Sequence, residues 1–256
     1  MTQLPSYNPT FSDAEQAARA AQWEADERAK KLAAESSRIH RWKETMGERY
    51  HDCRLSNYTT KYELQKKVRD ALVGYLRNIE ANLAEGKNLV LYGSVGTGKD
   101  HLAAAVLNET GNVMLRRYEA WLDEVSRGNL IPLQATGSVR AILGDDLRAW
   151  HKSTWYARRG EETEADIVNK LSASAMLLLS DPVTTVQHRE QMESLLFAII
   201  DRRYSTVRPT IITINAYDTE NVTNLLGPRI WDRLQEVAEI LHCNWPSYRQ
   251  RGKEPK

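Results

Sequence analysis

The chain lacks the features that would place it in a membrane or in an oxidising compartment. Its 256 residues include two cysteines, Cys53 and Cys243, which lie far apart and outside any CxxC pair. This spacing argues against a disulfide framework and against a zinc knuckle. The apolar stretches are far too short to span a bilayer, and the polar, proline-containing start has no apolar signal core. A reducing, cytoplasmic environment is therefore expected.

The chain also lacks an excess of either charge. Lys and Arg total 35 and Asp and Glu total 34, for a net charge of +1. Net charge therefore supplies no overall attraction to nucleic acid or to an anionic membrane, and any contact with DNA has to be local. With 41% hydrophobic and 27% charged residues, the composition fits one mixed domain with a smaller appendage.

Glycine and proline are missing from Ser12 to Met46, where Ala, Glu, Lys and Arg predominate. Ser12 and Glu15 form a capping box, so one long helix is predicted over residues 12–46. Its apolar face is thin, which indicates a helix that needs a partner; a solvated helix without a partner is the alternative. We therefore expect a helical partner-binding region at residues 1–54 and a second domain at residues 55–256.

In the second domain, apolar residues recur alternately with the spacing of a helix and with the pattern of a buried strand. Helices are predicted over residues 62–84, 101–107, 144–150, 161–171 and 191–204, and buried strands over 87–93, 138–143, 175–181 and 209–215. This alternation predicts an α/β fold in which helices flank a parallel sheet.

The stretch "LVLYGSVGTGKDHLAAAVL" contains the G-x4-G-K pattern of a phosphate-binding loop between an apolar strand and an apolar helix. Lys99 would place its charge beside the β and γ phosphates of ATP, and the loop amides would face the same oxygens. The predicted nucleotide-binding residues are Gly93, Ser94, Val95, Gly96, Thr97, Gly98, Lys99, Asp100 and His101.

Asp100 stands where such a loop normally has the Ser or Thr hydroxyl that binds Mg²⁺. A carboxylate is a good ligand for this cation, although it brings negative charge close to the phosphates. The alternative, that Asp100 only caps the following helix, is equally open.

Asp181 ends the apolar run "MLLLSD", which is the position expected of a second Mg²⁺ ligand. The residue that should follow it is a Glu that polarises the attacking water. Pro182 occupies that position and has no group that can accept a proton. The sequence therefore predicts that ATP is bound and hydrolysed weakly or not at all.

The segments "DRRYSTVRPTIITINAYDTENVTNLLGPRIWDRL" and "NWPSYRQR", together with "LSNY" and the phosphate loop, resemble the AAA+ domain of the DnaC-type replicative helicase loaders. They resemble the IstB-type transposition helpers and the DnaA initiator more distantly. The resemblance covers residues 55–256 and implies an AAA+ P-loop NTPase domain. Pro182 departs from the family pattern, which has Glu or Asp there.

The resemblance also implies roles for individual residues. Asn215 would be the sensor 1 residue beside the γ phosphate, and Arg249 the sensor 2 arginine. Arg233 would be the arginine finger and Arg229 its neighbour at a subunit interface, so that ATP would hold a homo-oligomer together. The last implication is a loop near the central channel of that oligomer, with Arg158 and Arg159 as candidates for contact with DNA.

The helix after the phosphate loop is followed by an insertion at residues 112–137, which suggests a lengthened helix and a surface excursion through Pro132. It contains Arg116, Arg117, Tyr118 and Trp121, a combination of charges and rings that suits single-stranded nucleic acid or, alternatively, helix packing.

Three functions are compatible with these features. The first is a loader whose N-terminal helix docks on a hexameric DnaB-type helicase and whose AAA+ domains assemble on single-stranded DNA. The second is an IstB-like transposition helper that acts on duplex DNA. The third is a pseudo-ATPase scaffold.

Overall fold

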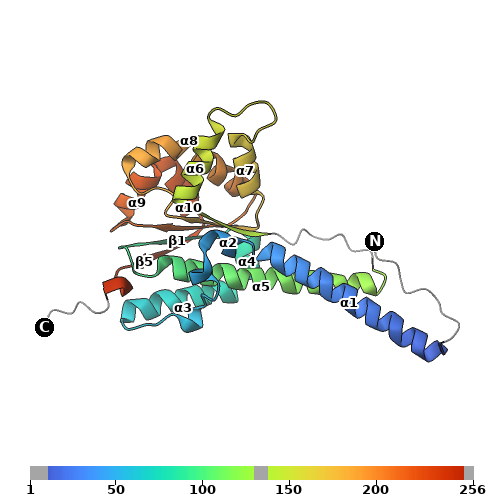
Figure 1. Ribbon diagram of the computed structural model, residues 1–256. Coiled ribbons are helices and arrows are strands. Elements are labelled where there is room, and N and C mark those ends of the chain that lie inside the picture. Colours follow the sequence, from blue (N-terminus) through green and yellow to red (C-terminus); the bar gives the residue numbers. More distant parts are fainter. Residues whose placement is uncertain (1–10, 130–137, 251–256) are drawn as a thin grey trace.

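A five-stranded parallel sheet forms the centre of the molecule in the computed structural model, which describes residues 11–129 and 138–250 (Figure 1). The strand order is β2-β3-β4-β1-β5. The bounds are β1 Asn88–Gly93, β2 Val139–Leu143, β3 Met176–Ser180, β4 Thr210–Ile214 and β5 Ala238–Cys243. The α/β prediction is confirmed, and the first four strands coincide with the predicted runs to within two residues at each end.

Helices cover both faces of the sheet, so that every residue of its three central strands is buried (Figure 1). One face carries α6 Gly144–Thr154, α7 Glu164–Ser172, α8 Val186–Ser205, α9 Thr219–Leu226 and α10 Pro228–Gln235. The other face carries α3 Glu63–Arg77, α4 Ile79–Ala84 and α5 Lys99–Ser126. The predicted helix 62–84 is therefore two helices, which meet at Asn78.

The helix at the N-terminal end of the described chain, α1 Asp13–Ile39, begins with the predicted capping box. The Ser12 amide donates to Glu15 Oε2 at 2.8 Å. The prediction of one helix to Met46 is wrong, because α1 ends at Ile39 and α2 Trp42–Met46 follows after a turn. At this turn the chain crosses α5 at Gly111. A side chain at position 111 would place its Cβ 3.0 Å from His40 Nε2, so the glycine permits this close approach. From the turn onward the chain packs against β2.

Helix α5 is much longer than the predicted segment 101–107 and runs beside α1 (Figure 1). Arg28 Nη2 of α1 lies 2.6 Å from Asp123 Oδ1 of α5. The insertion after the phosphate loop is thus a helical extension as far as Ser126, whereas Pro132 lies outside the described residues. No helix among the described residues is both long and apolar enough to cross a membrane.

The core is continuous across the predicted boundary at residue 54. Trp42, Met46 and Cys53 are at most 5% exposed and belong to the same apolar cluster as α5 and β1. Two single-turn helices connect this segment to α3, η1 Glu48–Tyr50 and η2 Leu55–Asn57, and a third, η3 Tyr248–Gln250, follows β5. The division into residues 1–54 and 55–256 remains a prediction about function.

Candidate nucleotide-binding site

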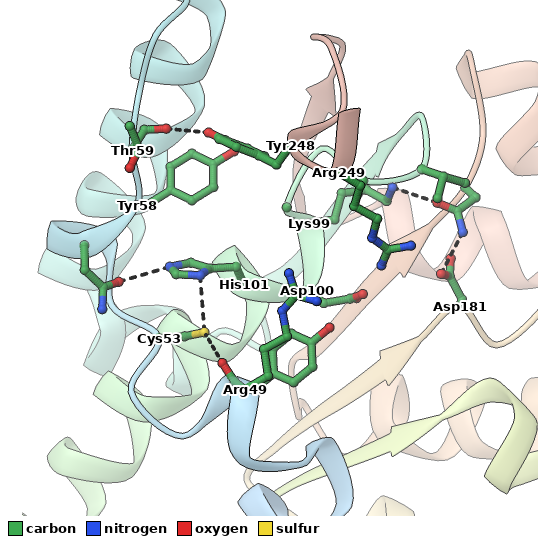
Figure 2. Close-up of a pocket in the computed structure, with 16 residues that line it drawn as sticks. Arg49, Cys53, Tyr58, Thr59, Lys99, Asp100, His101, Asp181, Tyr248 and Arg249 are labelled. Atoms are coloured by element: carbon green, nitrogen blue, oxygen red, sulfur yellow. Dashed lines mark hydrogen bonds between the residues drawn. The ribbon is translucent and has the colours of Figure 1, made fainter. Parts of the chain in front are cut away.

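A cavity of about 400 Å³ lies at the carboxyl ends of β1, β3 and β4, where the strands of a parallel sheet place their ligands (Figure 2). The phosphate loop between β1 and α5 forms its floor. Nine of the residues predicted from the sequence line this cavity: Val95, Gly96, Gly98, Lys99, Asp100, His101, Asp181, Asn215 and Arg249.

Lys99 starts α5 directly after Gly98, whose φ of 88° is left-handed and therefore suits glycine. Its ammonium donates to the carbonyls of Gly93 at 3.0 Å and Ser94 at 2.9 Å and to Asn215 Oδ1 at 2.8 Å. Burial lowers the pKa of Lys99, while the nearby Asp181 opposes that shift. The charge is thus held at the mouth of the loop, beside the predicted sensor 1 residue.

Two carbonyl groups of the phosphate loop accept hydrogen bonds from Tyr58, Trp245 and Tyr248. Thr97 O accepts hydrogen bonds from Tyr58 Oη at 2.9 Å and from Trp245 Nε1 at 2.8 Å. Gly96 O accepts from the Tyr248 amide at 2.8 Å. These three hydrogen bonds hold two of the loop carbonyls in place, and the N–H groups of the loop are the groups expected to bind an anion.

Asp100 is bound by two hydroxyl groups at the ends of neighbouring strands. Its Oδ1 accepts from Ser180 Oγ at 2.9 Å and from Thr213 Oγ1 at 2.7 Å. The side chain is therefore directed towards β3 and β4 and lines the cavity on the same side as Asp181. This geometry favours the ligand interpretation of Asp100 over a helix cap, because no side-chain cap bond forms at the start of α5.

Asp181 occupies a strained, half-buried position. Its φ is 45°, which is rare for a residue other than glycine. Its Oδ2 accepts from Asn215 Nδ2 at 2.7 Å, whereas the buried Oδ1 has no hydrogen-bond partner. Burial, followed by the charge of Asp100, raises the pKa of Asp181 to about 6.

This pair of carboxylates fits a hard divalent cation. Asp181 Oδ1 is an unpaired buried oxygen, and Asp100 provides a second carboxylate. Within the described residues no cluster of three or more His, Cys, Asp or Glu side chains could hold a metal. A cation here would need further oxygen ligands, as Mg²⁺ normally obtains from phosphates and water.

Pro182 lies away from the cavity. It is buried, and its carbonyl accepts a hydrogen bond from Arg148 Nη1 at 3.1 Å. Asp100 and Asp181 are the carboxylates that line the cavity, and the exposed Glu190 on α8 does not line it. Along the described lining, no Glu is in place to polarise a water molecule.

Several lining residues were not predicted from the sequence. Arg49, Tyr50 and Cys53 come from the segment before residue 54, and Tyr58, Thr59 and Tyr248 surround His101 on the other side. His101 Nδ1 lies 3.3 Å from Cys53 Sγ, and burial lowers its pKa. The motifs "LSNY", which contains Tyr58, and "NWPSYRQR", which contains Tyr248, were the signals in the sequence for this part of the cavity.

Two predicted interface residues lie on α10, outside the cavity lining. The Arg229 guanidinium lies 4.0 Å from the centre of the Phe197 ring. Arg233 Nε lies 3.0 Å from Asp201 Oδ1, and its guanidinium is 5.1 Å from the centre of the Tyr204 ring. Both arginines are thus held against α8 of the same chain.

The predicted DNA contacts lie in the loop between α6 and α7. Arg158 and Arg159 are exposed there, next to Trp155 and Tyr156, which are 51% and 88% exposed.

The second candidate set, on α5, is engaged within the chain. Arg116 pairs with Glu109 at 3.2 Å and Arg117 with Glu80 at 3.4 Å. The rings of Tyr118 and Trp121 stack with their centres 5.6 Å apart. These contacts favour helix packing over nucleic-acid binding for this set.

Comparison with known proteins gives a consistent result. No family model matches the chain. It is 30% identical over 208 residues to the replicative helicase loader DnaC of Escherichia coli (strain K12), covering 80% of this chain and 73% of that protein. Among solved structures, the DnaC helicase loader matches with a TM-score of 0.57 and 23% identity, covering 77% of this chain and 99% of that one. DnaA from Aquifex aeolicus, bound to AMPPCP, matches with a TM-score of 0.51 and 20% identity over 74% of this chain and 50% of that one. At these identities the two structures establish the shared fold.

Proposed function

This chain belongs to the family of DnaC-type replicative helicase loaders, and from this premise we propose that it is an ATP-controlled loader that places a DnaB-type hexameric helicase on single-stranded DNA. The observation that carries the proposal is the position of Lys99, between the loop carbonyls and Asn215 and opposite Asp181. This is the arrangement that a triphosphate requires.

ATP is the proposed ligand of the cavity. The loop amides and Lys99 would bind the phosphates, with Asn215 beside the γ phosphate and Arg249 entering from η3. Asp100 and Asp181 would hold Mg²⁺, which would neutralise charge on the β and γ phosphates. The structural relative that was solved with AMPPCP supports a nucleotide in this fold.

The nucleotide is proposed to act mainly by being bound. Pro182 has no group that accepts a proton, and no Glu among the described residues lines the cavity, so rapid hydrolysis lacks a placed base there. Arg233, with Arg229 beside it on α10, would reach the nucleotide of a neighbouring protomer and hold an ATP-dependent homo-oligomer together. Such a site would work as a switch between bound and free states.

Single-stranded DNA is proposed to bind at the loop between α6 and α7. Trp155 and Tyr156 offer exposed rings on which bases can stack, and Arg158 and Arg159 offer charge for phosphates. This combination supplies the local positive surface that the neutral net charge does not.

Helix α1 is proposed as the helicase-binding element. Ile39 is the one residue of α1 that is buried within the chain, and most of the helix surface is exposed. The helix extends beside α5 and away from the sheet (Figure 1), so a partner can approach it without contacting the nucleotide site.

Three measurements test the proposal together. They are the binding of a fluorescent ATP analogue with Mg²⁺, the release of phosphate from ATP, and the pull-down of a DnaB-type helicase in the presence of single-stranded DNA. We expect tight binding, little phosphate release and nucleotide-dependent capture of the helicase. Lys99→Ala should lower the affinity for ATP by about tenfold or more, because a charged hydrogen-bond donor to phosphate is lost.

Two results would replace the proposal. Assembly on duplex DNA without affinity for a helicase would indicate the IstB-like function. A wild-type chain that binds no adenine nucleotide but still captures the helicase would indicate a pseudo-ATPase scaffold.

A further inference from the structure

The segment between α1 and η2 forms one wall of the nucleotide cavity. Arg49, Tyr50 and Cys53 line the cavity, although they precede the first helix of the ATP-binding domain in the chain. Trp42 and Met46, earlier in the same segment, are 2% and 5% exposed in the core. The connection from α1 to the cavity is therefore packed along its length.

Hydrogen bonds hold this wall in place. Asn108 Nδ2 of α5 donates to the Cys53 carbonyl at 2.9 Å. His51 Nε2 lies 3.1 Å from the carbonyl of Lys43, which belongs to α2. These bonds fix the backbone between Lys43 and Cys53 relative to α2 and α5, and therefore fix where the side chains of this segment lie.

Arg49 is the cationic side chain that this segment contributes to the cavity lining. Two arginines of α1 are paired with carboxylates, Arg28 with Asp123 at 2.6 Å and Arg38 with Glu35 at 2.5 Å. Arg49 is exposed and forms no salt bridge within the part of the chain that the structure describes, and the same is true of Arg249 across the cavity.

The cationic side chains converge from three separate parts of the chain. Figure 2 shows Arg49 and Arg249 reaching the cavity from different segments, with Asp100 drawn between them. Burial, followed by the charge of Asp100, raises the pKa of Tyr50, and the charges of Arg49 and Arg249 oppose that shift. Tyr50 therefore lies in the field of both guanidinium groups at the Asp100 end of the cavity.

With Lys99 included, three cations and two carboxylates line the cavity, and a Mg²⁺ ion would occupy the carboxylates. The remaining arginines match the phosphate chain in charge and in hydrogen-bonding geometry, since guanidinium binds phosphate through two parallel N–H groups.

We propose that Arg49 binds the phosphate chain of the nucleotide, so that nucleotide binding fastens the segment that carries α1. This inference rests on the proposed ATP site and adds a residue to it. Lys99 and Arg249 belong to the ATP-binding domain, whereas Arg49 belongs to the connection with α1. Occupancy of the cavity is thereby transmitted to the helix proposed to bind the helicase.

The test compares Arg49→Ala, Arg49→Lys and the control Arg41→Ala, using fluorescent analogues of ATP and ADP with Mg²⁺. Arg41 is an exposed arginine of the same segment that does not line the nucleotide cavity. We expect Arg49→Ala to weaken ATP binding by about tenfold or more, on the magnitude of a charge-assisted hydrogen bond. Arg49→Lys should retain part of the affinity, and Arg41→Ala should bind like the wild type.

Hydrogen exchange gives a second readout. Adding the ATP analogue should slow amide exchange in residues 42–53 of the wild type and of Arg41→Ala, but not of Arg49→Ala at saturating nucleotide. Equal ATP affinity and equal protection in Arg49→Ala and the wild type would overturn this inference and leave the ATP site intact. If the wild type binds neither analogue, the ATP site and this inference both fail.

Discussion

Asp181, which lies next to the carboxylate of Asp100, is the residue of the cavity whose charge we expect to depend most on pH. Asp181 is half-buried beside Asp100, has a positive φ and leaves one buried oxygen unpaired. Asp100 is held by two hydroxyl groups and cannot move away without breaking both bonds. Lys99 partly offsets the charge of Asp181, but burial and Asp100 outweigh it, so ionising Asp181 in the folded chain costs free energy.

Asp181→Asn should stabilise the chain at neutral pH in the absence of nucleotide. The pKa of Asp181 is raised from 3.8 to about 6 in the folded chain. The stabilisation from the protonated form is complete below about pH 4 and is lost as the pH rises through 6. The variant should therefore be more stable to urea at pH 7.5, by on the order of 1 to 3 kcal/mol, and this advantage should shrink as the pH falls and vanish below about pH 4.

The same substitution should have the opposite effect on Mg²⁺-dependent ATP binding. Wild-type affinity should rise as the pH increases through 6, because the ionised carboxylate is the form that binds the cation, whereas the affinity of Asp181→Asn should be low and independent of pH. For the stability prediction, a difference in unfolding free energy between wild type and variant that is the same at pH 7.5 and at pH 4 would contradict the assignment of the titration to Asp181.

At the scale of single residues, the sequence predicted one half of the cavity. The phosphate loop and Asp181 are recognisable because their chemistry is local to one strand and the turn after it. Arg49, Tyr50 and Cys53 reach the cavity because the chain turns after Ile39 and crosses α5. That turn depends on tertiary packing at Gly111 and has no counterpart in residue spacing.

Among the elements, α7, α8 and β4 meet at one buried arginine. Arg203 of α8 is 1% exposed, and burial lowers its pKa to about 9. It donates to Thr210 Oγ1 at 2.9 Å, to Leu171 O at 3.1 Å and to Ser174 O at 2.8 Å. The guanidinium therefore joins the end of α7 and the starts of β3 and β4.

Arg203→Lys should destabilise the chain by about 2 to 4 kcal/mol, because one ammonium cannot reach all of these acceptors and leaves buried carbonyls unpaired. The neighbouring Arg202 is exposed, so Arg202→Lys serves as the control and should change the free energy of unfolding by less than about 0.5 kcal/mol. Urea denaturation measures both. Equal midpoints for the two variants would show that Arg203 does not join these elements.

The sequence predicted elements best where a buried strand gives a continuous apolar run. It predicted β1, β3 and β4 for that reason, but it missed β5, in which half-exposed and buried residues are mixed because it is an edge strand. The breaks at His40 and Asn78 were missed because helix propensity continues across both positions, and packing against α5 and the sheet decides where those helices end.

For the whole molecule, the contacts of α10 bear on assembly. Arg233 is paired with Asp201 of its own chain, and both side chains are about one-third or more exposed. A pair with this exposure contributes little, typically about 0 to 1 kcal/mol, so the phosphates of a neighbouring nucleotide can displace it.

Arg233→Ala should bind the ATP analogue as the wild type does but should fail to assemble when ATP is added. Asp201→Asn, which releases Arg233, should assemble at a lower protein concentration, and Arg202→Ala on the same face of the sheet should behave like the wild type. Sedimentation velocity with and without the ATP analogue measures all three. Full assembly of Arg233→Ala would remove this residue from the interface.

The Thr97 carbonyl, bound by both Tyr58 and Trp245, also bears on biosynthesis. In a nascent chain that includes the phosphate loop but not yet Trp245, the Thr97 carbonyl can accept a hydrogen bond from Tyr58 but lacks the one from Trp245. The proposed nucleotide site therefore has both of these supports only after the chain has been translated past Trp245.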